Sequence, residues 1–84
     1  MFQVLLYTKE NCLLCNEAEQ LLFIFEGSYS FQIVKRDIYT DDQLLEKYHL
    51  EIPVIEVNGK QIANEAINLE SIESLLKLGE KKLS

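Results

Sequence analysis

The sequence predicts an α/β fold whose strands and helices follow the order β-α-β-α-β-β-α. Stretches rich in β-forming residues alternate with segments in which apolar residues recur at helical spacing. Two short strands in the second half are joined by Asn58-Gly59, a pair that favours a two-residue hairpin turn. Apolar residues make up 48% of the 84 residues, which is typical of a globular protein, and this length accommodates one domain but not two. We therefore expect a single domain over residues 1–84.

The first strand is predicted from Phe2 to Tyr7, because this run is almost entirely apolar, as in a central strand that helices cover on both faces. The first helix follows, since apolar residues recur at helical spacing from Leu14 to Phe25 and acidic residues lie between them. Gly27 is available to end this helix.

The second strand is predicted from Phe31 to Ile38, which is rich in β-forming residues. Thr40 and Gln43 then form a capping-box pattern, with two aspartates at the start of the helix that follows. We expect this short second helix to run to about Tyr48. The third and fourth strands are predicted on either side of the hairpin turn and are therefore antiparallel; they are Val54–Val57 and Gln61–Ala63.

The last helix is predicted to begin after Asn68, a residue type that caps helix N-termini well. Gly79 is expected to end it, with Lys81 and Lys82 just beyond. The apolar side of this helix is formed by Leu69, Ile72, Leu75 and Leu76. Four aromatic residues are expected at core positions: Phe2, Phe23, Phe25 and Phe31.

Charge and hydropathy argue against several classes of function. Fourteen acidic residues against eight basic ones leave a net charge of −6, whereas general binding to nucleic-acid phosphates depends on Lys and Arg. The longest apolar stretches, Val4–Tyr7 and Leu21–Phe25, are too short to cross a bilayer, and no basic segment with a cleavage site opens the chain. We expect a cytoplasmic, monomeric protein that binds neither nucleic acid nor membrane.

Cys12 and Cys15 form a Cys-x-x-Cys pattern between the first strand and the first helix. In a compartment that keeps thiols reduced, this spacing indicates a catalytic or metal-binding pair rather than a structural disulfide. Cys12 falls near the helix N-terminus, where free backbone amides and the helix dipole favour a thiolate and lower the pKa of the thiol. Cys12 is therefore the expected nucleophile, and Cys15 the resolving thiol one turn inside the helix. Lys9 adds a positive charge nearby.

Two other functions are compatible with this pair of cysteines. Cys-x-x-Cys also supplies two of the four ligands of a zinc ion, or part of the ligand set of an iron-sulfur cluster shared between two chains. His49 is the only histidine and there is no third cysteine, so such a site would need ligands from a second chain, and no metal site is expected within this one. The second function is a non-enzymatic module that uses the fold as a binding surface.

Ile52-Pro53-Val54 places a proline at the entry of the third strand, where the loss of an amide donor is ordinarily a defect. In a sheet of this order, the start of the third strand would lie against the end of the first, beside the cysteines. A cis bond there would turn the Ile52 backbone outward, and an extended substrate could pair with it. The alternative is a proline that only starts an edge strand.

Three segments together resemble the glutaredoxins, and more closely the small glutaredoxin-like proteins of bacteria. They are Tyr7–Cys15 (Tyr-Thr-Lys-Glu-Asn-Cys-Leu-Leu-Cys), Ile52-Pro53-Val54 and Asn58-Gly59-Lys60, and the resemblance covers nearly the whole chain. It implies a thioredoxin fold, with a four-stranded mixed sheet in the order 2-1-3-4 flanked by three helices. It also implies that Cys12 attacks, that Cys15 resolves, and that Pro53 is a cis-proline facing them.

The resemblance also suggests residues that would bind glutathione. Lys9 matches the lysine that glutaredoxins place near the glutathione carboxylate. After the last hairpin, glutaredoxins have two glycines and an aspartate that holds the glutathione amino group, where this chain has Ala63, Asn64, Glu65 and Ala66. Asn64 or Glu65 would replace that aspartate. Glutathione is therefore one candidate reductant, and another cellular dithiol is the alternative.

These observations predict a thiol-disulfide oxidoreductase that reduces or exchanges disulfides of a protein or small-molecule substrate. Cys12 would form the mixed disulfide, and Cys15 would displace the reduced product. The reaction needs no bound organic cofactor. Leu13 and Leu14 stand where glutaredoxins usually have Pro-Tyr, so the redox potential of that family does not transfer to this chain.

Overall fold

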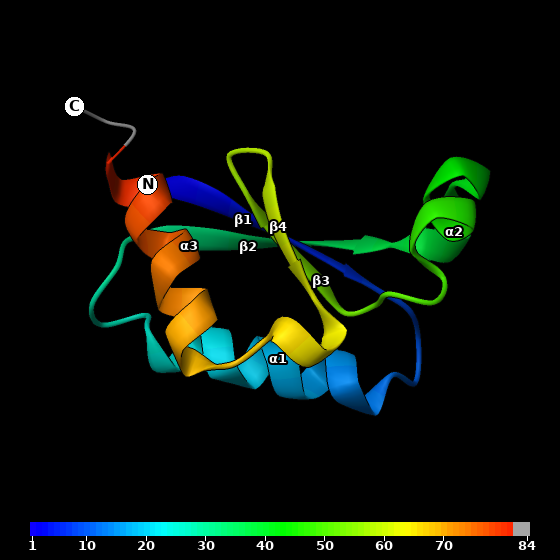
Figure 1. Cartoon of the computed structure of the whole chain (residues 1–84), viewed down its shortest axis with the longest axis horizontal. Helices are drawn as coiled ribbons and strands as arrows, with labels where there is room; N and C mark the ends of the chain where they lie inside the picture. The colour runs from blue at the N-terminus through cyan, green and yellow to red at the C-terminus, as the bar shows by residue number, and fades with distance from the viewer. Residues whose placement is uncertain (82–84) are drawn as a thin grey trace.

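The computed structural model describes residues 1–81, which form one four-stranded sheet with three α-helices and two short 3₁₀ turns (Figure 1). No helix among these residues is both long and apolar enough to cross a membrane. In chain order the elements are β1 (Phe2–Thr8), α1 (Leu13–Ile24), β2 (Phe31–Asp37), η1 (Ile38–Thr40), α2 (Asp42–Tyr48), β3 (Val54–Val57), β4 (Lys60–Ala63), η2 (Asn64–Ala66) and α3 (Leu69–Lys81).

The strands lie in the order β2-β1-β3-β4, so the predicted order 2-1-3-4 is confirmed. β1 runs parallel to β2 and antiparallel to β3, with Leu6 opposite Ile55. The hairpin between β3 and β4 turns at Asn58 and Gly59, whose φ angles of 53° and 85° are both positive, as a type I′ turn requires. Tyr7 at the end of β1 pairs with Val54 at the start of β3, so the loop after β1 lies close to Pro53.

The larger hydrophobic core lies on one face of the sheet, between the strands and the helices α1 and α3 (Figure 1). Alternate residues of each strand point into it, because successive side chains of a strand face opposite sides of the sheet. Its buried members are Val4, Leu6, Ala18, Leu22, Ile55, Val57, Ile72, Leu75 and Leu76. This core holds α1 against the sheet and thereby fixes the position of the cysteines at the start of the helix.

A smaller core lies on the opposite face, at the end of the sheet that α2 covers (Figure 1). Tyr48 of α2 is buried against Tyr7 of β1, with their rings stacked 4.5 Å apart. Ile38 and Val54 complete the buried part of this cluster. Helices therefore pack on both faces of the sheet, as expected for a nearly all-apolar β1.

Two predicted helix boundaries are wrong. Asp41, not Thr40, caps α2, because the Asp41 carboxylate accepts a hydrogen bond from the Gln43 amide at 2.8 Å. The Thr40 hydroxyl instead donates to the Asp37 carbonyl at 2.7 Å. The 3₁₀ turn η1 spans Ile38–Thr40, so Thr40 belongs to this turn and not to the start of α2. For the same reason Ile38 lies beyond the end of β2.

Gly79 does not end α3, which continues to Lys81; Lys82 lies outside the described residues. A Cβ atom at Gly79 would overlap the ring of Phe2, and Figure 1 shows the N-terminus beside the last turns of α3. This glycine therefore permits a close approach between α3 and β1.

Asn68 does cap α3, since its side-chain oxygen accepts a hydrogen bond from the Ser71 amide at 2.9 Å. Phe23 is 40% exposed and is not part of the core, in contrast to the sequence-based expectation.

Candidate active site

Cys12 is the N-cap residue of α1. The chain leaves β1 at Thr8, and Asn11 adopts a φ of 57°, in the left-handed region that asparagine tolerates better than most residues. Cys12 itself is extended, and its sulfur accepts a hydrogen bond from the Cys15 amide at 3.1 Å. Its carbonyl accepts from the Asn16 amide at 3.0 Å. The Cys12 sulfur therefore lies where the unpaired amides of the helix N-terminus stabilise negative charge.

Cys12 and Cys15 form a disulfide, with their Cα atoms 5.2 Å apart. Cys15 lies in the first turn of α1 and is 2% exposed, whereas Cys12 is 9% exposed. The two sulfurs are therefore close enough to form and break a disulfide with each other. Cys12 is the more accessible of the two residues. Within residues 1–81 no cluster of three or more His, Cys, Asp or Glu side chains is arranged to hold a metal ion.

Pro53 is buried, and the Ile52-Pro53 peptide bond is cis. The Ile52 amide donates to the Tyr48 carbonyl at 3.1 Å, and the Pro53 carbonyl accepts from the Asn64 amide at 2.8 Å. Pro53 and Asn64 also line one small pocket together with Leu14, the residue that precedes Cys15. The structure thus brings Pro53 and Asn64 against the face of α1 that carries Leu14.

Lys9 lies in a different pocket, of about 350 Å³, which Cys15 also lines. Glu19 and Lys35 form an ion pair in this pocket, with 3.2 Å between the carboxylate and the ammonium group. Glu65 is exposed in η2. The residues suggested for glutathione therefore occupy separate places, with Lys9 in one pocket, Asn64 in the other, and Glu65 on the surface beside Asn64.

The small pocket contains residues that sequence reasoning did not assign to the site. Leu14 was expected on the apolar face of the first helix, but its side chain is 54% exposed. Glu17, Ala18, Leu21 and Ile67 line the pocket with it. A signal that could have revealed the site is the Leu13-Leu14 pair, because two large apolar residues stand at the very start of the helix, where the first turn extends beyond the core.

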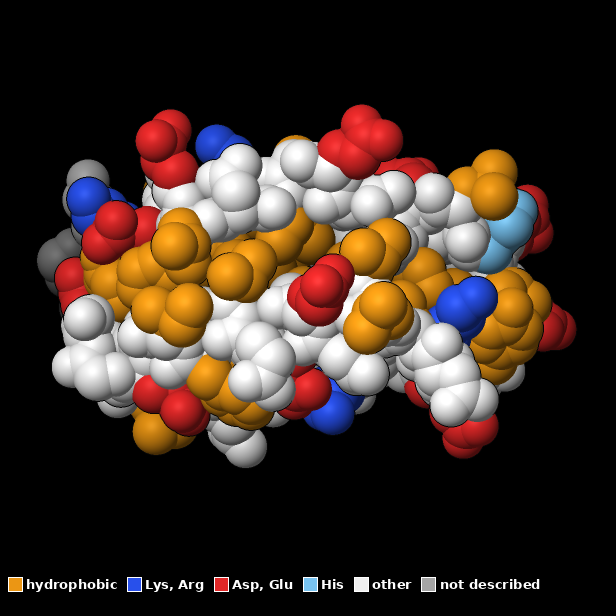
Figure 2. Space-filling view, turned by 90° about the horizontal axis from the view of Figure 1, so that it is seen from below, with side chains coloured by type: hydrophobic (Ala, Val, Ile, Leu, Met, Phe, Trp, Pro, Cys, Tyr) orange, Lys and Arg blue, Asp and Glu red, His pale blue; other side chains and the backbone are white. Residues whose placement is uncertain are grey.

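Exposed hydrophobic side chains gather on the α1 side of the molecule. Figure 2 views the molecule from this side and shows a band of hydrophobic side chains, with acidic side chains beside and within it. The exposed hydrophobic residues of α1 are Leu13 (73%), Leu14 (54%), Phe23 (40%) and Ile24 (62%). The helix that begins at the cysteines therefore belongs to a face with exposed hydrophobic and acidic side chains.

A second group of polar residues lies on the opposite face of the sheet, near α2. The hydroxyl of Tyr7 donates to Glu56 at 3.4 Å, and the Gln61 amide donates to Glu56 at 2.7 Å and to the Tyr48 hydroxyl at 2.6 Å. The pKa of Tyr7 is raised above its usual value, chiefly by burial and then by the negative charge of Glu56. This group links α2 to the sheet.

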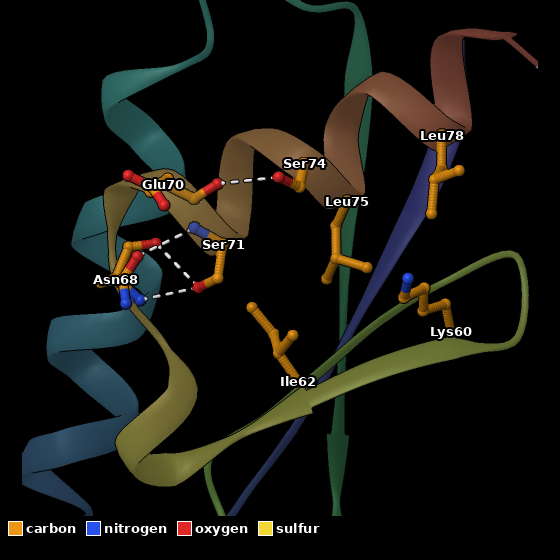
Figure 3. Close-up of a pocket in the computed structure, with 8 residues that line it drawn as sticks. All are labelled: Lys60, Ile62, Asn68, Glu70, Ser71, Ser74, Leu75 and Leu78. Carbon is orange, nitrogen blue, oxygen red and sulfur yellow. Dashed lines mark hydrogen bonds between the residues drawn. The ribbon is translucent and has the colours of Figure 1, made fainter.

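A larger pocket, of about 530 Å³, lies between β4 and α3, with Ile62, Leu75 and Leu78 among the residues around it (Figure 3). Of the polar groups drawn there, those at the start of α3 bond to one another: the Ser71 amide donates to Asn68, and the Ser74 hydroxyl donates to the Glu70 carbonyl at 3.2 Å (Figure 3). These bonds serve the start of α3. The pocket contains no cysteine, so the Cys12-Cys15 region is the better candidate for chemistry.

Comparisons with known proteins agree with this geometry. The family model described as "Glutaredoxin-like domain (DUF836)" matches residues 3–77. The protein XcR50 from X. campestris has a similar structure, with a TM-score of 0.72 and 22% identity over 89% of this chain and 96% of that one. The structure of a malarial protein gives a TM-score of 0.60 with 15% identity, over 94% of this chain and 97% of that one. A mutant of the thioredoxin-like protein BC3987 gives a TM-score of 0.60 with 18% identity, over 87% of this chain and 97% of that one. These structural similarities show a shared fold.

Proposed function

The chain belongs to the glutaredoxin-like family, and from this premise we propose that it is a thiol-disulfide oxidoreductase whose dithiol is Cys12 and Cys15. The observation that carries the proposal is the disulfide between the N-cap residue of α1 and a buried cysteine one turn later. In the reduced form, the helix N-terminus favours the thiolate of Cys12, the more accessible residue. Cys15 is buried and close enough to attack the Cys12 sulfur. The substrate is a disulfide of a protein or a small molecule.

The reaction proceeds in two displacements. The Cys12 thiolate attacks one sulfur of the substrate disulfide, so the substrate bond breaks, a mixed disulfide forms, and the other substrate sulfur leaves as a thiolate. Cys15 then loses its proton to solvent and attacks the Cys12 sulfur. The second substrate sulfur leaves as a thiolate, and two electrons have passed from the protein to the substrate. The short Cα separation of 5.2 Å favours the second step, because it is intramolecular.

A second thiol compound must then reduce the Cys12-Cys15 disulfide. We propose glutathione or another cellular dithiol for this step, with Lys9 as the partner of a carboxylate and Asn64 or Glu65 as partners of an amino group. Ile52 and Pro53 would contact the substrate beside the cysteines. In this proposal the protein is monomeric and cytoplasmic, has no bound organic cofactor, and acts on neither nucleic acid nor membrane.

Trapping with single-cysteine variants tests the two roles. We expect Cys12→Ser to abolish disulfide reduction, because no thiolate remains at the helix N-terminus. Cys15→Ser should still attack the substrate but stop at the mixed disulfide, which mass spectrometry detects as an adduct on Cys12. Equal trapping by both variants would contradict this division of roles.

A redox titration tests the activity itself. The protein is equilibrated in glutathione buffers of graded potential, and alkylation with iodoacetamide counts the free thiols by mass. A reversible two-electron couple, with Cys12 reacting at a pH well below the value of about 8.5 for a free thiol, supports the oxidoreductase. Two ordinary thiols that never form a disulfide would favour a binding module. Stoichiometric zinc or iron that is lost in Cys15→Ser would favour a metal site shared between two chains.

A further inference from the structure

The small pocket beside the cysteines has a predominantly apolar lining and holds about 120 Å³. Leu14, Ala18 and Leu21 of α1 form one wall, and Ile67 and Pro53 face them from the other side. An apolar cavity of about 150 Å³ holds a molecule the size of benzene, so this pocket is large enough for one aliphatic side chain. Ala18 and Pro53 are buried, and Leu21 and Ile67 are partly buried, so these walls are held in place by the fold.

The pocket lies close to the cysteines, because one of its lining residues stands between them in the sequence. Leu14 is between the two cysteines, and Pro53 immediately precedes the strand that pairs with the end of β1. An extended peptide advances about 3.3 Å per residue. A side chain one or two residues from a cysteine bound at Cys12 would therefore reach the pocket.

The charge beside the pocket favours a basic substrate. Among residues 1–81, Glu17 is the only charged residue that lines it, and the chain as a whole has a net charge of −6. At neutral pH glutathione carries two carboxylates but only one ammonium group, so a negatively charged site repels the molecule as a whole. A peptide with a lysine or arginine beside its aliphatic residue would instead be attracted.

We propose that this pocket is a specificity subsite that receives an aliphatic side chain, one or two residues from the reacting cysteine of a basic polypeptide substrate. The inference rests on the proposed oxidoreductase function and names its substrate class as a protein disulfide. Leu14 is the key contact, because it is half exposed, lines the pocket, and lies between the cysteines. Glu17 selects the charge of the neighbouring residue.

Single-turnover reduction of designed peptides tests the subsite. Each peptide carries one cysteine as a mixed disulfide with thionitrobenzoate, whose release is followed by absorbance after mixing with the reduced protein. The peptides have leucine or alanine two residues from the cysteine, next to lysine or glutamate. We expect the leucine peptide to react about ten-fold faster than the alanine peptide, since filling a small apolar pocket typically gives at least this discrimination.

Leu14→Ala and Leu13→Ala form a matched pair of variants. Both remove an exposed leucine between the same cysteines, but only Leu14 lines the pocket. We expect Leu14→Ala to reduce the preference for leucine to less than about three-fold, whereas Leu13→Ala retains it. Glu17→Gln should reduce the preference for lysine over glutamate, and added salt should do the same in the parent protein.

The outcomes separate this inference from the proposed function. Equal rates with leucine and alanine peptides would overturn the subsite and leave the oxidoreductase intact. Loss of the preference to the same extent in both leucine variants would also overturn it, because the effect would not belong to the pocket. Faster reaction of the glutathione mixed disulfide than of any peptide would overturn the proposed substrate class. Failure to release thionitrobenzoate from any substrate would overturn the proposed function itself.

Discussion

At the scale of single residues, the site depends on a cysteine in a position that local stability does not favour. N-cap positions prefer Ser, Thr, Asp or Asn, whose oxygens accept hydrogen bonds from the first helical amides. Here the Cys12 sulfur accepts instead, from the Cys15 amide. Asn11 and Asn64, in the segments on either side of the site, have φ angles of 57° and 43°. Asparagine adopts this conformation more readily than most residues, and Asn58 does so in the hairpin turn.

Tyr7 is expected to make stability depend on pH above about 10, the usual pKa of tyrosine. Its pKa is raised in the folded protein, so the neutral form is favoured there; the resulting stabilisation is complete below the unfolded pKa and is lost as pH rises through the folded one. Urea unfolding at pH 8 and pH 11 measures the loss. Tyr7→Phe should lose less stability than the parent over this interval.

The Glu56→Gln variant separates the two largest causes of that shift. Because burial is the larger cause and the charge of Glu56 the second, we expect the pKa of Tyr7 to fall in this variant but to remain above the usual value. NMR titration of the Tyr7 ring carbon measures it directly. An unchanged pKa would contradict a role for the Glu56 charge.

At the scale of elements, polar side chains decide where α2 and α3 begin. Asn68 and Ser71 bond reciprocally at the start of α3, at 2.9 and 3.0 Å, and Asp41 caps α2. Gly79 lies inside α3, where glycine is ordinarily unfavourable. Its role is therefore steric: it lets the ring of Phe2 approach the helix backbone.

Gly79→Ala is expected to destabilise the protein, although alanine is the better helix former. The added methyl group would overlap the Phe2 ring, and overpacking of this kind typically costs about 1–3 kcal/mol. The free energy of unfolding in urea measures the change. Gly27→Ala is the control, because nothing lies within 4 Å of a Cβ atom there, and its effect should stay within about 0.5 kcal/mol. A stabilised Gly79→Ala protein would show that the Phe2 contact is not restrictive.

At the scale of the whole molecule, the sheet separates two cores of unequal size. The larger one joins α1 and α3 to the sheet, and the smaller one holds α2 at one end of the opposite face. The helix that carries the cysteines is thus anchored in the larger core through Ala18 and Leu22, while Leu13 and Leu14 at its start remain exposed. This arrangement anchors the middle of α1 in the core and leaves exposed leucines at the end that carries the cysteines.

Leu22→Ala should therefore destabilise the entire domain. Leu22 is 0% exposed, and deletion of such a side chain costs about 2–5 kcal/mol, a large part of the roughly 5–15 kcal/mol that stabilises a typical domain. Thermal and urea unfolding measure the loss. Ile24→Ala on the same helix is the control, because that residue is 62% exposed and should change stability by less than about 0.5 kcal/mol. Similar losses in the two variants would mean that α1 is not anchored as described.

Three features could be read from the sequence: the order of the elements, the antiparallel hairpin at Asn58-Gly59, and the position of Cys12 and Cys15 at the start of a helix. These features follow from local spacing, turn chemistry and capping, which act over a few residues. Tertiary structure alone decided that Phe23 is exposed, that Gly79 accommodates Phe2, and that Leu14, Pro53 and Ile67 meet in one pocket. Each of these depends on contacts between segments far apart in the chain, and such contacts leave no periodic trace in the sequence.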